Sequence, residues 1–387
     1  MRKILLFLLI FINIGLLFSE EIQNKLVGPG IRHLKFYENK GPWAIDVLEV
    51  DLTNPNLRIE SVKANDSVVG REKTSTMARR KDRIGHWVVG AINADFFNPD
   101  GSPTNCQIVN GAILKTPNKY SVLGFYENLK PFIEIIKYKG EVISQDEVRH
   151  INGINRGRDT DELLVYNHYF GANTNTNIWG AELRFRSIDN WAVNDTFRVK
   201  VVDIDSTKGS QNIPGNGGVL SGHGFSRNWL LQEVSIGDTL KLILKLVPIK
   251  EKILEMVGGI PRIIRNGKIS IEEGYSDSNF AKFRHPRTAV GFSKDSTKMF
   301  LFTVDGRQPG YSVGMSLYEE AEFLLDLGVY QAINLDGGGS TTMVVRNKIE
   351  NRPSDPNGER AVSNALLLIS KVPLDKFPVS KISPNNN

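Results

Sequence analysis

The chain has 387 residues, of which 40% are hydrophobic and 24% are charged, a composition typical of a soluble globular protein with a sizeable core. Its formal net charge is only +5, and the lysines and arginines are spread along the chain, which argues against a nucleic-acid partner. The single cysteine, Cys106, excludes an internal disulfide and a zinc site built from several thiolates. A small buried hydrophobe is the commoner role of such a residue, and a catalytic thiol is the alternative.

The first segment has the layout of an export signal. Arg2 and Lys3 precede an apolar run over residues 4–18, which Ser19 and an acidic pair follow. This order predicts a signal peptide over residues 1–19 and an exported protein, in the periplasm, at the cell surface or secreted. A membrane anchor that stays attached is the alternative, but about 15 apolar residues are short for a span. We therefore expect no stable membrane span after the signal is removed.

Strand patterns are commoner than helical ones in the rest of the chain. Short β-type runs fill residues 125–257 without a Pro- or Ser-rich spacer, so we interpret them as a variable, β-rich part of one domain over residues 36–371. Residues 372–387 offer little to bury and are expected to form a flexible tail. We predict an α+β fold of mixed β-sheets with few helices.

Several strands are bounded by polar or turn residues. The dipeptides Asn110-Gly111 and Asn266-Gly267 each separate two apolar pieces, a strong signal for a two-residue hairpin. The apolar strand predicted over residues 86–92 opens directly onto Asn93 and Asp95. Polar side chains at the end of a buried strand often carry function.

One helix is predicted clearly, over residues 316–327. Ser316 and Glu319 have the spacing of a capping box, and Gly328 supplies the stop signal. Apolar residues recur on one face between them, so this helix is expected to cover a sheet.

Strand patterns at residues 298–304 and 329–335 flank that helix. This β-α-β order predicts two parallel neighbouring strands, whose carboxyl ends lie at the same edge of the sheet. Those ends carry Asp305, Arg307 and Asp336, which we expect to converge on one rim.

Asp336 begins a glycine-rich loop. Gly337, Gly338, Gly339 and Ser340 follow it, and glycines let the backbone approach a ligand closely and turn its N–H groups into an anion-binding nest. A phosphate suits such a loop. The alternative is a tight turn that is glycine-rich for structural reasons alone.

Two arginines near this loop suggest phosphate recognition. Arg287 lies at the entry to an apolar strand, and together with Arg307 it is expected to provide fork-shaped donors for a phosphate. His285 is a candidate proton donor, although a loop histidine is more often structural. The same reservation applies to His223.

Four ordered motifs resemble those of the phosphodiester glycosidase family. The resemblance runs from about residue 36 to residue 370 and is densest after residue 286. Its motifs are AINADFF at 91–97, PRTAVG at 286–291, VDGR at 304–307 and NLDGGGSTT at 334–342.

The resemblance implies a hydrolase that removes N-acetylglucosamine joined through its anomeric carbon to a phosphate. The short, cysteine-poor chain is similar to the bacterial branch, so a cell-envelope or exopolysaccharide phosphodiester is the expected substrate. A phosphate monoester leaves as a stable anion, since its second pKa is about 6, so strong acid assistance matters less than in ordinary glycoside hydrolysis.

The chemistry then needs a carboxylate that activates water or attacks the sugar, and groups that stabilise the leaving phosphate. For the first role the candidates are Asp336, Asp305 and Asp95. Substrate binding is assigned to Arg287, Arg307, Asn93, Asn334, Gly337, Gly338, Gly339 and Ser340.

Two other interpretations stay open. No cofactor is required by these residues, but Asn93, Asp95, Asp305 and Asp336 also offer hard oxygen ligands to a divalent cation. The chain is alternatively a non-catalytic envelope protein that binds an anionic glycan in the same cleft. Such a protein would keep the arginines and glycines but would not need the carboxylates.

Overall fold

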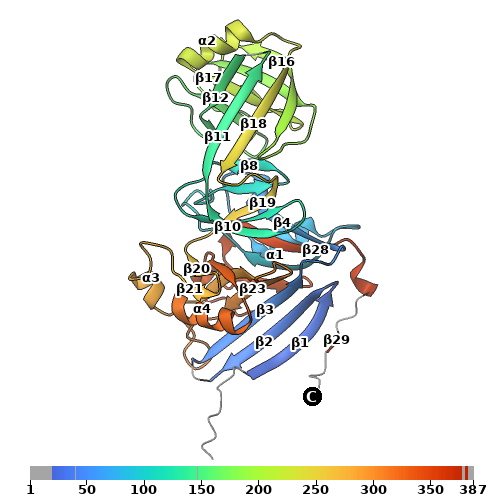
Figure 1. The fold of residues 1–387 in the computed structure, drawn as a ribbon, viewed down its shortest axis with the longest axis vertical. Coiled ribbons are helices and arrows are strands. Elements are labelled where there is room, and N and C mark those ends of the chain that lie inside the picture. The colour runs from blue at the N-terminus through green and yellow to red at the C-terminus, as the bar shows by residue number, and fades with distance from the viewer. Residues whose placement is uncertain (1–19, 40, 146, 377–379, 382–387) are drawn as a thin grey trace, which may run out of the picture.

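The computed structural model describes residues 20–39, 41–145, 147–376 and 380–381, and it consists mostly of strands (Figure 1). This confirms the coarse prediction of a strand-rich fold with few helices, although among the described strand pairs only β13 and β14 are parallel. The signal predicted over residues 1–19 lies outside the described residues. In the part described, none of the helices has the length and apolar character needed to cross a membrane. The α-helices of that part are α1 (Thr74–Lys81), α2 (Gly224–Glu233), α3 (Asn279–Lys282) and α4 (Leu317–Asp326), and its 3-10 helices are Ala64–Asp66, Gly338–Ser340 and Leu374–Lys376.

A nine-stranded sheet, the first sheet, forms one end of the molecule (Figure 1). Helix α4 packs against it through the buried side chains of Leu317, Ala321 and Leu324. The capping box of Ser316 and Glu319 is formed as predicted. In spatial order the strands are β21 (Lys268–Ile269), β20 (Arg262–Arg265), β24 (Gln331–Asn334), β22 (Arg287–Phe292), β23 (Lys298–Val304), β3 (Trp43–Asp51), β2 (Ile31–Glu38), β1 (Glu20–Gly28) and β29 (Ser380–Lys381).

The predicted β-α-β unit is corrected in one respect. Strands β23 and β24 run in the same direction, but they are not neighbours, because β22 lies between them and is antiparallel to both. The crossover through α4 therefore spans one intervening strand. The carboxyl ends of β23 and β24 still lie at the same edge of the sheet, beside the start of β22.

A five-stranded second sheet packs on the first. The two share a buried apolar core, to which Leu48, Val290 and Ile333 of the first sheet and Ile92 and Leu366 of the second contribute. Its strands are β26 (Lys348–Ile349), β25 (Met343–Val345), β6 (Trp87–Asn93), β28 (Asn364–Ser370) and β4 (Leu57–Lys63), and the small pair β27 (Ala361–Val362) and β5 (Glu72–Lys73) lies apart from it.

A third sheet of five strands connects these layers to the middle of the chain. The turn at Asn110-Gly111 forms here as predicted, with positive φ at both residues. The turn at Asn266-Gly267 forms in the same way in the first sheet. The third sheet consists of β10 (Pro131–Ile135), β9 (Ser121–Tyr126), β19 (Ile253–Gly258), β7 (Gln107–Val109) and β8 (Ala112–Lys115).

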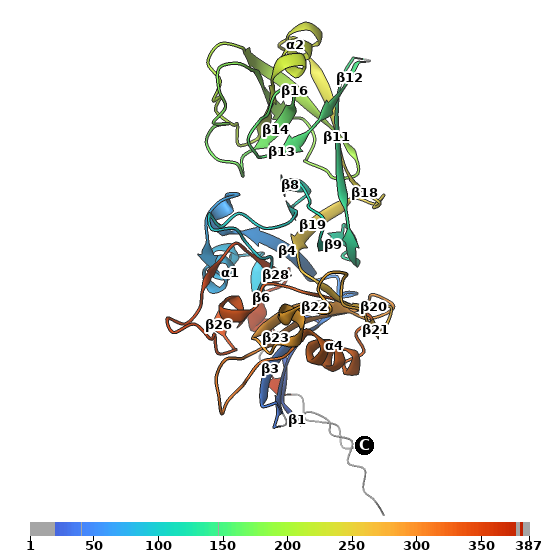
Figure 2. The ribbon, with the colours of Figure 1, turned by 90° about the vertical axis from the view of Figure 1, so that its left-hand side faces the viewer.

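An eight-stranded lobe stands at the other end of the molecule (Figure 2). Its apolar interior continues into the third sheet, since Phe185 and Leu242 of the lobe share one core cluster with Ile108, Val122 and Met256. The strands of the lobe are β12 (Glu147–Ile151), β11 (Lys137–Ser144), β18 (Thr239–Val247), β16 (Thr196–Asp205), β15 (Ala181–Ser187), β17 (Gly217–Gly222), β14 (Leu163–Asn167) and β13 (Gly153–Ile154).

The end of the chain is partly described. Of the tail predicted over residues 372–387, Leu374–Lys376 forms a 3-10 helix and β29 pairs with β1 through Lys381 and Lys25.

Candidate active site

Two of the predicted carboxylates meet where the first and second sheets end. Strand β6 leads into Asp95, and β24 leads into Asp336. The backbone N–H of Asp336 donates to the carbonyl of Ala94 at 2.8 Å, and the side-chain amide of Asn93 donates to the carbonyl of Asp336. The negative charge of Asp336 acts directly on Asp95. We call these two residues the carboxylate pair.

Asp95 is held in a closed pocket and is 1% exposed. Its Oδ2 accepts the backbone N–H of Asn105 at 2.8 Å, and its own N–H donates to Oδ1 of Asn364 at 2.8 Å. A side chain in place of Gly258 would collide with the carboxylate. Burial raises the pKa of Asp95 to about 7, the N–H of Asn105 opposes this effect and the charge of Asp336 adds to it.

Asp336 is less enclosed, being only partly buried. Burial raises its pKa to about 7 as well, opposed in turn by the side chain of Ser340, the positive charge of Arg360 and the N–H of Gly337. Neighbouring carboxyls with raised pKa values titrate as a pair. Near pH 7 this pair therefore holds about one proton, and the other carboxylate is free to accept one.

The glycine loop is tightly packed rather than open. The N–H of Gly338 donates to the carbonyl of Pro286 at 2.8 Å, and a Cβ on Gly337 would lie 2.7 Å from the same oxygen. The predicted anion nest is therefore incorrect for Gly338, because its N–H group is used inside the protein.

The glycines instead make room for two arginines. Gly338 has φ +64°, and a Cβ there would lie 2.9 Å from Nη2 of Arg307. A Cβ on Gly339 would collide with Arg360 and its partner Asp355, whose Oδ2 lies 2.7 Å from Nε of Arg360. Both arginines are exposed, and Arg307 adopts a left-handed φ of +59° that positions it over the loop. Arg360 was not predicted, since nothing in its local sequence marks it.

Arg287 does not join them, which corrects the predicted fork. It is 1% exposed, and its Nε donates to the carbonyl of Met315 at 2.9 Å. Its Nη2 donates to the carbonyls of Phe280 and Phe283, and the guanidinium carbon lies 4.8 Å from the ring centroid of Phe280. The guanidinium therefore supports the segment that contains α3 and is not presented to a substrate.

Asp305 is likewise used inside the protein and does not converge with Asp336 as expected. Its carboxylate accepts from Nδ2 of Asn351 at 3.0 Å, the backbone N–H of Arg352 at 2.9 Å and the hydroxyl of Tyr311 at 3.0 Å. Burial raises its pKa to about 6, and these donors oppose the shift. Asp305 therefore anchors the loop that follows β26.

The predicted amides fix the backbone around the pair. Oδ1 of Asn93 accepts from Oγ1 of Thr288 at 2.9 Å and from the N–H of Thr342 at 3.0 Å. Nδ2 of Asn334 donates to the carbonyl of Ile260. Asn93 and Asn334 thus position the ends of β6 and β24.

Several buried polar atoms in this region lack partners within the described part of the chain. Most buried polar groups are hydrogen-bonded, so such atoms are expected where a ligand or water binds. They are Oδ1 of Asp95, Oδ1 of Asn334, Oγ1 of Thr342 and Nε2 of Gln107.

A row of aromatic rings starts beside the pair. Phe96 follows Asp95 directly and packs edge-on against Phe280, whose ring lies 6.2 Å from that of Tyr275. The ring of Tyr120 lies 6.1 Å from that of Tyr275. These rings come from distant segments, so no local pattern predicts this aromatic wall. It offers flat apolar surface to a sugar ring.

The remaining candidates, two histidines and the cysteine, do not belong to the pair. Burial and the charges of Arg287 and Arg307 lower the pKa of His285, which favours the neutral imidazole. His223 precedes α2 in the eight-stranded lobe. Cys106 is fully buried in the core, and burial raises the pKa of its thiol, which opposes a catalytic thiolate.

The oxygen ligands proposed for a divalent cation do not assemble into one set. Both Asn93 and Asp305 use oxygens for protein donors. Elsewhere in the described part, His33, Asp46 and Glu350 bring ligand atoms within 4.8 Å of one another. There Nζ of Lys35 lies 3.2 Å from Asp46 and 2.9 Å from Glu350, so an ammonium already bridges the two carboxylates.

Comparison with known proteins finds a family similar to part of this chain. A model of the phosphodiester glycosidase family matches residues 190–369. The N-acetylglucosamine-1-phosphodiester alpha-N-acetylglucosaminidase of Mus musculus is 37% identical over 113 residues, which cover 26% of this chain and 21% of that protein. The human protein of that name matches to the same extent. The chain thus spans about a fifth of the length of these curated relatives.

The fold also occurs in solved structures. A hypothetical protein from Synechocystis has a TM-score of 0.65 and 20% identity over 88% of this chain and 62% of its own. The matched segment 190–369 contains Asp336, Arg307 and Arg360, whereas Asp95 lies outside it. Residues 190–369, with the glycine loop and both arginines, therefore match the model of the phosphodiester glycosidase family that the motifs of the sequence resemble.

Proposed function

We propose that this chain is a hydrolase that cleaves the bond between a sugar and a phosphodiester. The observation that supports this most is the carboxylate pair, Asp95 and Asp336, next to a glycine loop that holds Arg307 and Arg360. The pair supplies proton-accepting capacity near neutral pH, and the arginines supply positive charge for a phosphate.

In this proposal Asp336 is the base or nucleophile. It is the more accessible member of the pair, and it lies on the loop that carries the arginines. As a base it takes a proton from the water that attacks the anomeric carbon, while the bond from that carbon to oxygen breaks and the phosphate monoester leaves with the electron pair. The two carboxyls share about one proton near pH 7, because a charge on either one opposes ionisation of the other.

Arg307 and Arg360 are proposed to bind the phosphate. Negative charge grows on the leaving oxygen in the transition state, and guanidinium donors placed there stabilise it more than the ground state. Asp355 orients Arg360 through their ion pair. This assignment replaces Arg287 with Arg360.

For the sugar we propose alpha-linked N-acetylglucosamine 1-phosphate, after the printed activity of the mouse and human relatives. The aromatic wall of Phe96, Phe280 and Tyr275 offers a surface for the sugar ring. The apolar N-terminal segment favours export, and envelope or exopolysaccharide material is the proposed source of the diester.

The test is a turnover assay on the methyl phosphodiester of alpha-N-acetylglucosamine, with release of the free sugar as the signal. We expect multiple turnovers, with equal rates in the presence and absence of a chelator. A rate that disappears with chelator and returns with added metal would favour the divalent-cation alternative.

The second candidate function is a non-catalytic protein that binds an anionic glycan. The exposed Arg307 and Arg360 favour it, since they need no reaction to bind an anion. It predicts tight binding of the diester without release of the sugar, in the wild type and in Asp336→Asn alike. This binding function does not explain the raised pKa values of Asp95 and Asp336.

A further inference from the structure

A groove lies between the eight-stranded lobe and the third sheet, apart from the carboxylate pair. It comprises a cavity of about 640 Å³ and a second of about 330 Å³. Both are lined by Glu127, Asp189, Asn190, Trp191 and Leu254, so we treat them as one groove along Trp191. Cavities of this size accommodate small organic ligands or a few linked rings.

Aromatic rings and amides dominate the larger cavity. The indole of Trp191 is fixed from behind by Phe197, with ring centroids 5.0 Å apart. Tyr169 and His168 present a second pair of rings, 4.1 Å apart. Flat rings of this kind stack on the apolar faces of sugars while neighbouring polar groups meet the hydroxyls.

The polar groups of the groove are available to a ligand. In the described part of the chain, the side chains of Asn190 and Asn216 make no hydrogen bond, and Oγ of Ser187 is buried without a partner. A buried hydroxyl without a hydrogen-bond partner costs free energy unless a ligand or water supplies that partner. Amides both donate and accept, as recognition of sugar hydroxyls requires.

The charge of the groove disfavours an anionic ligand. Among its described lining residues, the larger cavity contains no lysine or arginine. Of its two carboxylates, Asp189 is occupied by Nε and Nη2 of Arg198 at 2.9 Å each, and Glu127 is exposed. Lys252 in the smaller cavity is paired with Asp195. By contrast, the glycine loop of the candidate active site carries two exposed arginines beside Gly338 and Gly339.

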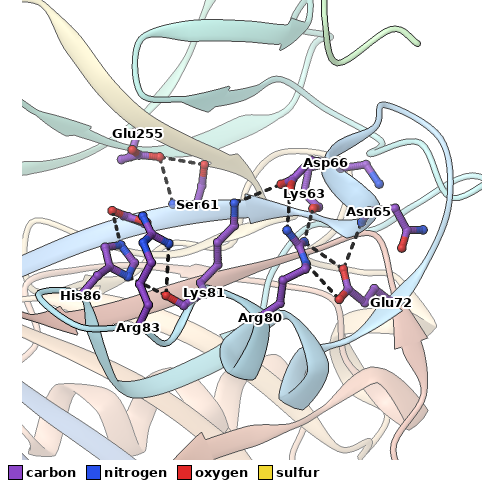
Figure 3. Close-up of polar contacts among 11 residues, drawn as sticks. Ser61, Lys63, Asn65, Asp66, Glu72, Arg80, Lys81, Arg83, His86 and Glu255 are labelled. Atoms are coloured by element: carbon purple, nitrogen blue, oxygen red, sulfur yellow. Dashed lines mark hydrogen bonds and ion pairs between the residues drawn. The ribbon is translucent and has the colours of Figure 1, made fainter. Parts of the chain in front are cut away.

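The floor of the groove is rigid. The N–H of Asn110 donates to Oε1 of Glu255 at 3.1 Å, and Oδ1 of Asn110 accepts from Nη2 of Arg58 at 2.8 Å. The same carboxylate accepts from the N–H and hydroxyl of Ser61 on β4, as Figure 3 shows. Burial raises the pKa of Glu255 to about 8. Among the other charged side chains of Figure 3, Arg80 is paired with Glu72 and Asp66, and Lys81 is paired with Asp66.

We propose that this groove binds a neutral oligosaccharide segment, separately from the carboxylate pair. Strand β19 connects the two places, because Leu254 lines the groove and Gly258 packs against Asp95. Four residues of strand span about 13 Å, so one glycan chain of a few sugars reaches from one site to the other. The groove would hold a polymer while its phosphodiester lies at the carboxylate pair.

The test measures binding by calorimetry with neutral tetrasaccharides of N-acetylglucosamine, glucose and mannose as probes. The protein carries Asp336→Asn to prevent turnover. We expect at least one tetramer to bind with a Kd of about 1 mM or lower. Asn190→Ala with Asn216→Ala should weaken it about tenfold or more, since each lost hydrogen bond costs about 1 kcal/mol.

Trp191→Ala should abolish binding. Because Trp191 packs on the lobe, Trp191→Phe serves as a second variant that keeps an aromatic ring and should retain part of the affinity. Trp179→Ala, which removes a 69% exposed tryptophan of the same lobe that does not line the groove, should leave binding unchanged.

The proposal is overturned if none of the tetramers binds, if the double asparagine variant binds as the parent does, or if only a peptide or a charged glycan binds the groove. In the chain that carries Asp336, the double variant should keep its kcat/KM on the small methyl diester. Failure of glycan binding is thereby distinguished from failure of the proposed hydrolysis.

Discussion

Two loops of this protein begin with the same Asp-Gly pair and end up with different roles. Asp305-Gly306 follows β23 and Asp336-Gly337 follows β24, and these strands point the same way. Asp305 receives three protein donors, whereas Asp336 lies beside a second carboxylate and two arginines. Position on a strand end is therefore not enough to make a catalytic group, because distant segments decide whether its oxygens are already used.

Arg287 and Arg307 differ in the same way, since one is used inside the protein and the other is exposed. The guanidinium of Arg287 donates to the carbonyls of Met315, Phe280 and Phe283, while Arg307 is exposed over Gly338. Burial converts the first into a structural cation and leaves the second for a ligand.

The largest expected effect is that of Asp336→Asn, which removes the proposed base or nucleophile and keeps the shape of the loop. We expect kcat to fall about a hundredfold or more, with little change in the urea midpoint. Steady-state kinetics on the methyl diester and an unfolding curve provide the measurement. Wild-type turnover in this variant would move the role to Asp95.

A smaller loss is expected when the phosphate-binding arginines are removed. Arg307→Ala and Arg360→Ala should each lower kcat/KM on the diester about 10- to 100-fold, since each loses a charged hydrogen-bond donor to the phosphate. The comparison substrate is a neutral aryl glycoside of the same sugar, on which the losses should be slight. Equal losses on both substrates would argue against phosphate recognition.

Arg287→Ala is the matched control for that pair. It removes the guanidinium hydrogen bonds to three backbone carbonyls, of which that of Met315 keeps the N–H of His285, so we expect the free energy of unfolding to fall by about 2 kcal/mol or more. Its kcat/KM should change by a similar factor on the diester and on the neutral glycoside. A selective loss on the diester would restore Arg287 as a phosphate ligand.

Asp305→Asn should act on stability more than on turnover. The carboxylate anchors Asn351, Arg352 and Tyr311, and an amide can accept only part of those hydrogen bonds. We expect unfolding to become easier by about 1–2 kcal/mol, measured by urea denaturation. A drop in kcat with unchanged stability would contradict the anchoring role.

The smallest expected effect is a shift in pH dependence. If Asp336 must be ionised, turnover falls as the pH drops through about 7, because burial raises its pKa to that value. Asp95→Asn removes the neighbouring negative charge that opposes this ionisation, so the acid limb should move to lower pH. If the acid limb of Asp95→Asn lies at the same pH as that of the wild type, the two carboxyls titrate independently.

Much of the site was predictable from local pattern. The motifs around Asp95, Arg307 and Asp336 each end a predicted strand, and the helix of residues 316–327 follows from its capping box. The insertion of β22 between β23 and β24 was not predictable, since strand order depends on pairing between distant segments. Arg360 was missed for the same reason, because it reaches Gly339 only in the folded chain.

The central claim is that Asp336, and not Asp305, performs the chemistry on a sugar 1-phosphodiester. The most direct test is the ratio of the kcat values of Asp305→Asn and Asp336→Asn, measured side by side on the methyl diester at pH 7. We predict that Asp305→Asn is faster by a factor of about 30 or more. Equal rates, or a slower Asp305→Asn with intact folding, would contradict this account.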